Sequence, residues 1–313
     1  MRILLAPMEG VVDPYMRELL TRIGGYDGCV TEFLRVTRGR VPRRNILRIC
    51  PEISTGGRTA SGIPVTVQLL GGDAEAMALN AGIIAGMGAP GIDLNFGCPS
   101  KQVNANDGGA ILLKKPERIY AIVAAVRQAV PDTTPVSAKI RLGVDDTALA
   151  LENAHAVEDG GADFITVHAR TRADGYRAPA RWEWLAAVNE ALSIPVTANG
   201  DIRSVEEYWR CREMSGCEDV MIGRAAVGRP DLALQIRYAQ QQRQAKALHW
   251  QEVRDLMLQL GEQMAEGMES RHVATRLKQW LTYLKQEYRE AVDCFEQLRR
   301  LRTFEEMVAA IRP

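Results

Sequence analysis

Residues 93–109 read DLNFGCPSKQVNANDGG and join a short apolar run to a loop rich in glycine and proline. The run ends at Asn95 and suits a buried strand. The glycines and the proline beyond it predict a tight, irregular loop. Cys98 stands just past the strand end, where it is held in place and reachable, whereas a structural cysteine more often lies inside an apolar run. A small residue that fills a turn is the alternative reading of Cys98.

Eight short apolar runs alternate with longer amphipathic segments along the chain. The runs are 3–7, 29–33, 65–70, 92–95, 136–142, 164–168, 196–199 and 220–223. This alternation predicts an α/β fold, a (β/α)₈ TIM barrel. A doubly wound sheet is the competing fold, but it normally carries an early glycine-rich dinucleotide turn, and the chain has no GxGxxG.

Polar side chains follow every one of these runs. In a TIM barrel the carboxyl ends of the strands meet at one mouth, which carries the active site. One or two such residues could be hydrogen-bonded barrel groups, but a ring of them predicts a functional site. The ring consists of Glu9, Glu32, Gln68, Asn95 with Cys98, Lys139 with Arg141, His168 with Arg170, Asn199 with Asp201, and Arg224.

The last two runs predict a phosphate site. Residues 199–201, Asn-Gly-Asp, follow the seventh run, and Gly223 and Arg224 follow the eighth. Barrels commonly bind phosphate at these two loops through glycine N–H groups and a helix N-terminus. A flavin mononucleotide fits this pattern, and so does any phosphorylated metabolite.

The character of the chain changes after Pro230. A polar stretch, 239–245, is followed by apolar residues at helical spacing from Trp250 onward, with no proline before Pro313. This predicts a barrel domain over residues 1–242 and a small helical-bundle domain over 243–313.

Composition excludes several classes of protein. The 313 residues carry no net charge, so binding of nucleic acid requires local basic regions. The six cysteines form no CxxC and have no metal-ligand spacing with the four histidines. We therefore expect a reduced, cytoplasmic protein without a metal. The N-terminus lacks a signal-peptide core, and no segment is long enough to span a membrane.

The motif Asn95-Phe96-Gly97-Cys98-Pro99 resembles the signature of the tRNA-dihydrouridine synthases, which are flavin enzymes that reduce uridine in tRNA. The resemblance extends through essentially the whole chain. The opening residues 6–11, APMEGV, are similar to bacterial subfamily C, which acts at position 16 of tRNA. The resemblance implies FMN as cofactor, NADPH or NADH as electron donor and tRNA as partner, and we expect a monomer.

The resemblance also implies roles for individual residues. Cys98 is the proton donor to C5 of the base, while the hydride reaches C6 from reduced FMN. His168 is expected to support the flavin, although a hydrogen-bonded strand-end histidine is the alternative. Implied flavin contacts are Pro7, Met8, Glu9, Gln68, Lys139, Asn199, Gly200, Asp201, Gly223 and Arg224; implied tRNA contacts are Arg35, Asn95, Tyr176, Arg276, Lys278 and Arg299.

The residues themselves leave two chemical roles open for Cys98. A thiolate nucleophile needs a depressed pKa, which Lys139 or His168 could provide. A general acid must remain a thiol, which its usual pKa allows at neutral pH.

Two regions could bind polyanions. Residues 35–48 carry six arginines and no acid, and they follow the second run, so they should lie at the rim of the mouth. Residues 271–302 carry eight basic and four acidic residues, together with Trp280, Tyr283 and Tyr288. Aromatic residues on such helices more often belong to the core than to a stacking surface.

Two other functions compete with a flavin-dependent tRNA reductase. One is an FMN-dependent TIM-barrel dehydrogenase of a free pyrimidine or other small molecule, which would need neither the arginine-rich segment nor the helical tail. The other is an RNA-binding protein without catalysis, which would not need Cys98, Lys139 or the phosphate loops.

Overall fold

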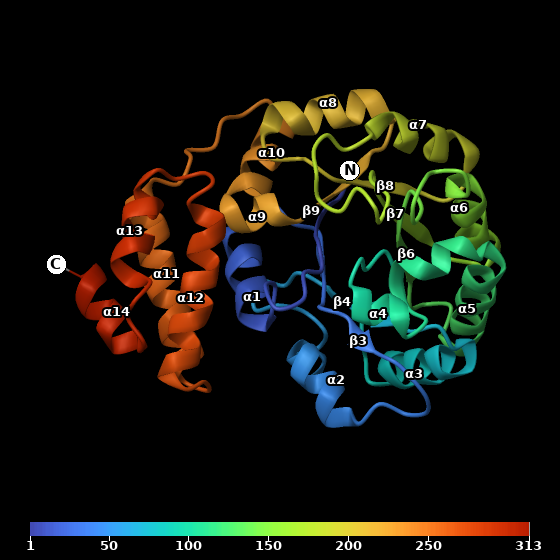
Figure 1. Ribbon diagram of the computed structural model, residues 1–313, viewed down its shortest axis with the longest axis horizontal. Helices are drawn as coiled ribbons and strands as arrows, with labels where there is room; N and C mark the ends of the chain where they lie inside the picture. The colour runs from blue at the N-terminus through green and yellow to red at the C-terminus, as the bar shows by residue number, and fades with distance from the viewer. Residues whose placement is uncertain (313) are drawn as a thin grey trace.

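In the computed structural model, which describes residues 1–312, nine parallel strands form one closed sheet (Figure 1). The hydrogen-bonded order is β2-β1-β9-β8-β7-β6-β5-β4-β3, and β2 also pairs with β4, which closes an eight-stranded ring. The strands are β1 (Ile3–Leu5), β2 (Gly28–Val30), β3 (Leu34–Arg35), β4 (Val65–Leu70), β5 (Ile92–Phe96), β6 (Val136–Arg141), β7 (Phe164–His168), β8 (Val196–Asn199) and β9 (Asp219–Ile222).

The eight strands of this ring confirm the predicted TIM barrel. Their bounds agree with the apolar runs to within a few residues, because strands buried on both faces have continuously apolar sequences. The run 29–33 is the exception, since β2 ends at Val30. The two-residue β3 that follows was not predicted. It pairs with the end of β4, Leu34 opposite Leu69, and this contact between distant residues leaves no periodic signal.

Helices surround the barrel in the order of the strands. Polar residues begin several of them: the Asp13 carboxylate accepts a hydrogen bond from the Met16 N–H at 2.9 Å, and Asp73 and Ser204 cap their helices in the same way. The barrel helices are α1 (Pro14–Ile23), α2 (Arg43–Ile49), α3 (Ala74–Gly86), α4 (Lys101–Ala105), α5 (Pro116–Ala129), α6 (Ala150–Asp159), α7 (Trp182–Ala191), α8 (Val205–Ser215), α9 (Arg224–Gly228) and α10 (Leu232–Gln240), with 3₁₀ turns at Pro51–Thr55 and Gly109–Lys114.

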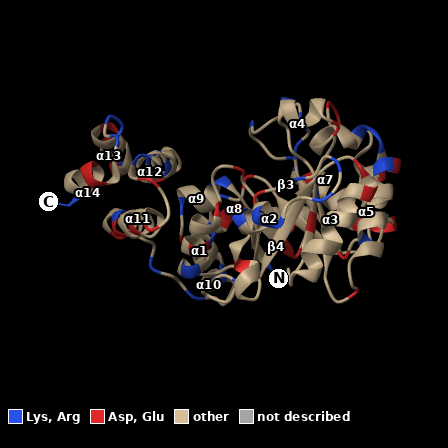
Figure 2. Ribbon diagram, turned by 90° about the horizontal axis from the view of Figure 1, so that it is seen from below, with Lys and Arg blue, Asp and Glu red and all other residues tan. Residues whose placement is uncertain are grey.

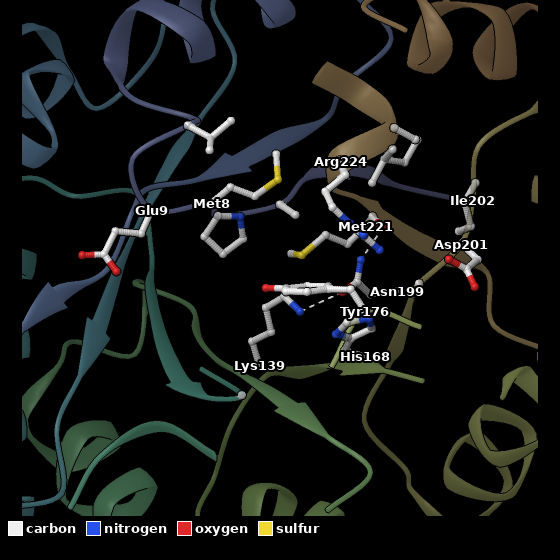
Figure 3. Close-up of a pocket in the computed structure, with 18 of the residues that line it drawn as sticks. Met8, Glu9, Lys139, His168, Tyr176, Asn199, Asp201, Ile202, Met221 and Arg224 are labelled. Carbon is white, nitrogen blue, oxygen red and sulfur yellow. Dashed lines mark hydrogen bonds between the residues drawn. The ribbon is translucent and has the colours of Figure 1, made fainter. Parts of the chain in front are cut away.

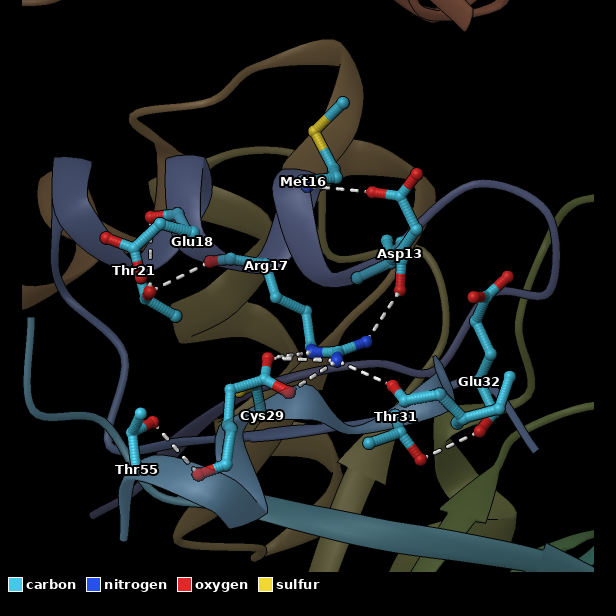
Figure 4. A network of polar contacts seen from close by, with 12 residues as sticks. Asp13, Met16, Arg17, Glu18, Thr21, Cys29, Thr31, Glu32 and Thr55 are labelled. Carbon is cyan, nitrogen blue, oxygen red and sulfur yellow. Dashed lines mark hydrogen bonds and ion pairs between the residues drawn. The ribbon is translucent and has the colours of Figure 1, made fainter. Parts of the chain in front are cut away.

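A buried arginine ties α1 to the segment before β4 (Figure 4). The Arg17 guanidinium is fully buried and lies 2.9 Å from the Glu52 carboxylate. It also donates to the carbonyl oxygens of Ile49 at 2.8 Å and Val12 at 3.3 Å. A buried charge is tolerated because it is paired and hydrogen-bonded in this way. The network therefore fixes the start of α1, which follows the first loop of the barrel mouth.

Four helices after the barrel form a bundle beside it: α11 (Trp250–Ala265), α12 (Ser270–Leu284), α13 (Glu290–Leu298) and α14 (Phe304–Ile311) (Figure 1). The bundle contacts the barrel through α12 against α9 and α11 against α1. Trp280 is almost fully buried at this contact, and its indole N–H donates to the Val227 carbonyl at 2.9 Å. Trp280 is thus a core residue. The exact domain boundary after residue 242 stays a prediction, within the link from Gln240 to Trp250.

A candidate active site at the barrel mouth

A cavity of about 710 Å³ lies at the carboxyl ends of the strands. This volume is typical of a site for a cofactor or small molecule. Residues in or shortly after all eight strands of the ring line it, and Tyr283, Gln286 and Glu287 of the bundle side close one wall. Figure 3 shows Lys139, His168, Asn199 and Arg224 directed into this one space. The predicted active-site mouth is therefore a single cavity shared by barrel and bundle.

The structure brings most of the sequence-predicted site residues together around this cavity. Those that line it are Pro7, Met8, Glu9, Gln68, Asn95, Cys98, Lys139, His168, Tyr176, Asn199, Gly200, Asp201, Gly223 and Arg224.

Four residues expected to contact tRNA lie outside the cavity lining: Arg35, Arg276, Lys278 and Arg299. Arg276 is engaged with the barrel, with its guanidinium 2.5 Å from the Asp13 carboxylate. Lys278 donates to the Leu301 carbonyl at 2.9 Å within the bundle. Arg299 is about half exposed and pairs with Glu296 at 2.7 Å. Contact of these residues with tRNA stays a prediction.

The Cys98 loop is held by the side chain of Asn95. Its carbonyl oxygen accepts hydrogen bonds from the backbone N–H groups of Gly97 at 3.0 Å and Cys98 at 2.9 Å. Burial raises the pKa of the Cys98 thiol, although the backbone N–H of Ser100 opposes the shift. Cys98 is therefore a protonated thiol at neutral pH. Of the two roles that the sequence left open, this favours the general acid over the thiolate nucleophile.

Lys139 extends from β6 into the cavity beside Asn199. Its ammonium donates to the Asn199 side-chain oxygen at 2.8 Å (Figure 3), while the Asn199 amide N–H₂ donates to the Met221 carbonyl at 2.7 Å. These two bonds fix the orientation of the amide. Burial, together with the nearby charge of Arg141, lowers the pKa of Lys139 to about 7. Lys139 is thus a cation that can lose its charge near neutral pH.

His168 is neutral at physiological pH. Burial lowers its pKa well below the ordinary value, and the neighbouring cations Arg141 and Lys139 act in the same direction. Arg170 lies 3.2 Å from its Nε2 and can only donate, so Nε2 accepts and the proton is on Nδ1. Arg170 is fully buried and pairs with Asp201 at 2.5 Å. His168 is both a hydrogen-bonded strand-end histidine and part of the cavity wall.

The loops after β8 and β9 form a cationic end of the cavity, where Arg203 and Arg224 line the wall. Gly200 has a φ of +124°, a conformation that side chains rarely adopt, and a Cβ there would lie 3.1 Å from Ala180. A Cβ on Gly223 would meet nothing nearer than 3.6 Å. The turn after β8 therefore requires its glycine, whereas a Cβ on Gly223 would be in ordinary van der Waals contact with Ala6 and Met8.

Arg141, which the sequence placed in the polar ring without a specific role, and Arg224 lie on the ring of Tyr176, at 5.4 and 4.5 Å from its centroid. Other residues were not assigned to the site from the sequence. Tyr283 enters the cavity wall from the bundle, which only the tertiary fold could show. Asp93 is buried inside β5 beneath the cavity. An acidic residue inside an apolar strand was the signal that could have identified it.

The closed parallel barrel with its site at the carboxyl ends of the strands defines a TIM-barrel enzyme. Residues 4–311 match the family model described as Dihydrouridine synthase (Dus), and the chain belongs to this family of oxidoreductases. No helix within residues 1–312 has both the length and the apolar content needed to cross a membrane. In the same residues, no cluster of three His, Cys, Asp or Glu side chains could hold a metal ion.

Curated relatives are similar over nearly the whole chain. A tRNA-dihydrouridine(16) synthase of Pseudomonas putida is 49% identical over 96% of this chain and 93% of its own length. Proteins of the same name from Ralstonia nicotianae and Shewanella oneidensis are 49% and 46% identical, each over 99% of this chain and 95% and 97% of their own lengths. Among solved structures, a 2-naphthoyl-CoA reductase complex matches with a TM-score of 0.59 at 11% identity, over 77% of this chain and 50% of that one, which shows the fold alone.

Proposed function

We propose that this protein reduces the uridine at position 16 of tRNA to 5,6-dihydrouridine, with FMN as bound cofactor and NADPH or NADH as electron donor. The observation that carries the proposal is the half-buried, protonated Cys98 thiol at the rim of the 710 Å³ cavity. The chain that holds it is 46 to 49% identical, over nearly its whole length, to proteins named tRNA-dihydrouridine(16) synthase.

The residues of the cavity fit a flavin mononucleotide. Arg224 and Arg203 supply positive charge at the cavity wall beside Gly223, as a phosphate requires. Met8 and Met221 offer apolar surface for a flat ring, and Gln68 and Lys139 offer polar groups at its edge. When bound and reduced, FMN supplies the hydride to C6 of the uracil ring.

The protein supplies the proton and the electrostatic environment. Cys98 donates the thiol proton to C5 of the base, which completes the reduction of the 5,6-double bond, and the resulting thiolate takes a proton from water. Negative charge develops on a carbonyl of the base before C5 is protonated. Lys139 and Arg141 lie in the same cavity and can stabilise this charge. The raised pKa of Cys98 keeps the proton available at neutral pH.

The second part of the proposal concerns how tRNA is held. A base in a folded RNA loop must leave its stack to enter a barrel mouth. The bundle stands beside the mouth and contributes Tyr283 to its wall, so it is positioned to hold the tRNA body. Figure 2 shows basic residues on α2 and α12. We infer a monomeric, cytoplasmic enzyme with a catalytic domain over residues 1–242 and a tRNA-binding domain over 243–313.

Mapping of dihydrouridine tests this function. Purified protein with FMN and NADPH should form dihydrouridine at position 16 of a tRNA transcript, and a transcript with cytidine at position 16 should remain unmodified. tRNA from cells without the gene should lack the modification at this position alone. Modification at another position would contradict the assignment of position 16, and equally efficient reduction of free uridine would favour an enzyme of small molecules.

A further inference from the structure

A chain of buried hydrogen bonds runs from Cys98 to Asp93. The backbone N–H of Cys98 donates to the side-chain oxygen of Asn95 at 2.9 Å, and the Asn95 amide N–H₂ donates to the Gln68 side-chain oxygen at 2.8 Å. The Gln68 amide N–H₂ donates in turn to the Asp93 carboxylate at 2.6 Å. Ser137 donates to the other carboxylate oxygen, also at 2.6 Å. Asp93 is therefore the terminal acceptor of the chain.

The chain has one direction, and both of its ends require it: the backbone N–H groups of Gly97 and Cys98 can only donate, and the Asp93 carboxylate can only accept. Asparagine and glutamine amides have an oxygen at one end and an N–H₂ at the other, and either end can face a neighbour. A carboxylate has no hydrogen to donate, so Gln68 must turn its N–H₂ toward Asp93. Its oxygen then faces Asn95, which must turn its N–H₂ toward Gln68. The Asn95 oxygen is thereby directed at the backbone N–H groups of the Cys98 loop.

We propose that Asp93 is a positioning residue for the reaction: its buried carboxylate anchors the hydrogen-bonded amides of Gln68 and Asn95 and so holds the Cys98 loop in place. This inference rests on the proposed role of Cys98 as proton donor. Asp93 itself lies beneath the cavity and does not line it, so it acts through its neighbours.

A buried charge such as that of Asp93 destabilises the folded state unless hydrogen bonds compensate for its removal from water. Asp93 is 1% exposed, and burial raises the pKa of its carboxyl to about 6, against the hydrogen bonds from Gln68 and Ser137 and the nearby charge of Lys139. The group therefore remains ionised at neutral pH, as a terminal acceptor requires. A neutral amide of the same shape would fill the same space, but it would replace the charge-assisted hydrogen bond from Gln68 by a weaker neutral one.

Exchange of the two groups tests this directly. In Gln68→Glu two buried carboxylates face each other, and the chain must break or take up a proton. In Asp93→Asn the charge-assisted hydrogen bond from Gln68 is lost, and the chain ends on a weaker, neutral acceptor. In the double variant the new amide at position 93 can donate its N–H₂ to the new carboxylate at position 68, and it can accept from Ser137 through its oxygen. Asn95 can still donate to that carboxylate. The net charge and every hydrogen bond are then restored without change at Asn95 or Cys98.

The measurement is the rate of alkylation of Cys98 by iodoacetamide as a function of pH, on the purified holoenzyme in a Cys294→Ser background. Of the cysteines in the described residues, Cys98 and Cys294 are the two that are not fully buried. Release of the loop should expose the thiol. A fall in its pKa of about half a unit to one unit would raise the rate at pH 8 roughly three- to tenfold. We expect this increase in both single variants, larger in Gln68→Glu, and a return to the wild-type profile in the double variant.

Ser137→Ala is the matched control, because it removes a hydrogen bond to Asp93 outside the chain; at pH 8, well above the pKa of Asp93, it should leave the alkylation rate unchanged. The inference is wrong if the single variants have the wild-type profile, or if the folded double variant does not regain it. If Gln68→Glu does not fold, Asp93→Asn and the double variant decide the question. The readout is the thiol and not turnover, so a failure of the proposed tRNA reaction would not be mistaken for a failure of this inference.

Discussion

The guanidinium of Arg276 lies 2.5 Å from the carboxylate of Asp13, and this contact joins the helical bundle to the barrel. The same carboxylate caps α1 through the Met16 N–H. Arg276 also donates to the backbone carbonyl oxygens of Gly10 and Val11, in the loop that follows β1. That loop begins with side chains that line the cavity. One arginine of the bundle thus holds a loop of the active site.

Replacement of Arg276 by alanine should destabilise the protein. The Arg276 and Asp13 side chains are only 18% and 17% exposed, and a hydrogen bond to a charged group contributes about 1.5–3 kcal/mol. We expect a loss of this size in the free energy of unfolding, measured by urea denaturation. Arg299→Ala is the control, since its ion pair with Glu296 is about half exposed and should contribute less than about 0.5 kcal/mol. Equal losses in the two variants would contradict a special role for Arg276.

The salt dependence of tRNA binding separates this role of Arg276 from a contact with tRNA phosphate. Loss of one phosphate contact reduces the slope of log K against log salt concentration by about 0.7–0.9. Because the guanidinium is already engaged with Asp13, we expect Arg276→Ala to leave the slope unchanged. A reduced slope would support the tRNA contact expected from the sequence.

Replacement of Cys98 should separate the two half-reactions. Cys98→Ala should accept electrons from NADPH as the wild type does, because the thiol is not needed for this step. Its reduced form should convert tRNA about 10²- to 10⁴-fold more slowly, the usual contribution of a general acid. Stopped-flow measurement of flavin absorbance follows both steps. Equal loss in both would indicate that Cys98 only maintains the structure.

Replacement of Arg224 should weaken cofactor binding. Its guanidinium stands at the cationic end of the cavity, beside Gly223. Loss of a charged hydrogen bond of about 1.5–3 kcal/mol should raise the dissociation constant of FMN roughly 10- to 150-fold. Arg229→Ala is the control, because Arg229 donates to Gln235 outside the cavity. An Arg224→Ala protein that retains its full flavin content would show that the phosphate is held elsewhere.

His168 should make the protein sensitive to mild acid. Its pKa in the folded state is lowered by burial, so below about pH 6.5 the unfolded chain binds a proton that the folded protein does not. Stability is therefore fully present above about pH 6.5 and falls as the pH decreases, by at most about 1.4 kcal/mol per pH unit. The variant His168→Gln cannot bind this proton in the unfolded state, so this contribution to the pH dependence is absent. Urea denaturation at pH 7.5 and pH 5.0 should show a smaller loss in the variant, and parallel losses would mean that His168 is charged in the fold.

The arginine cluster of residues 35–48 should supply affinity for tRNA and not specificity for one uridine. Arg38, Arg40, Arg43 and Arg44 are exposed, so their charges are accessible to a polyanion. Their joint neutralisation to glutamine should weaken binding at low salt and reduce the salt slope by up to about 2.8–3.6 units. Reduction of the flavin by NADPH should be unaffected. An unchanged slope would place the tRNA on another face.

The sequence by itself determined the barrel and the position of its active site. Strands buried on both faces must be continuously apolar, so the eight runs predicted the eight strands of the ring. Parallel strands bring all their carboxyl ends to one side, so the polar residues after the runs had to meet. Ten of the twelve residues in the predicted polar ring line the cavity for this reason, and only Glu32 and Arg170 do not.

Only the tertiary structure decided the charge states of those residues and the hydrogen bonds and ion pairs between them. Burial of Lys139, the neutral state of His168 and the raised pKa of Cys98 all depend on neighbours from other strands. The pairing of Arg276 with Asp13 joins residues 263 positions apart, and no local pattern encodes it. The direction of the hydrogen-bonded chain that ends in the buried carboxylate likewise depends on side chains from β4, β5 and β6 that pack together only in the closed barrel. Sequence periodicity reports which face of a strand is buried, whereas electrostatics and hydrogen bonding depend on distances that folding alone sets.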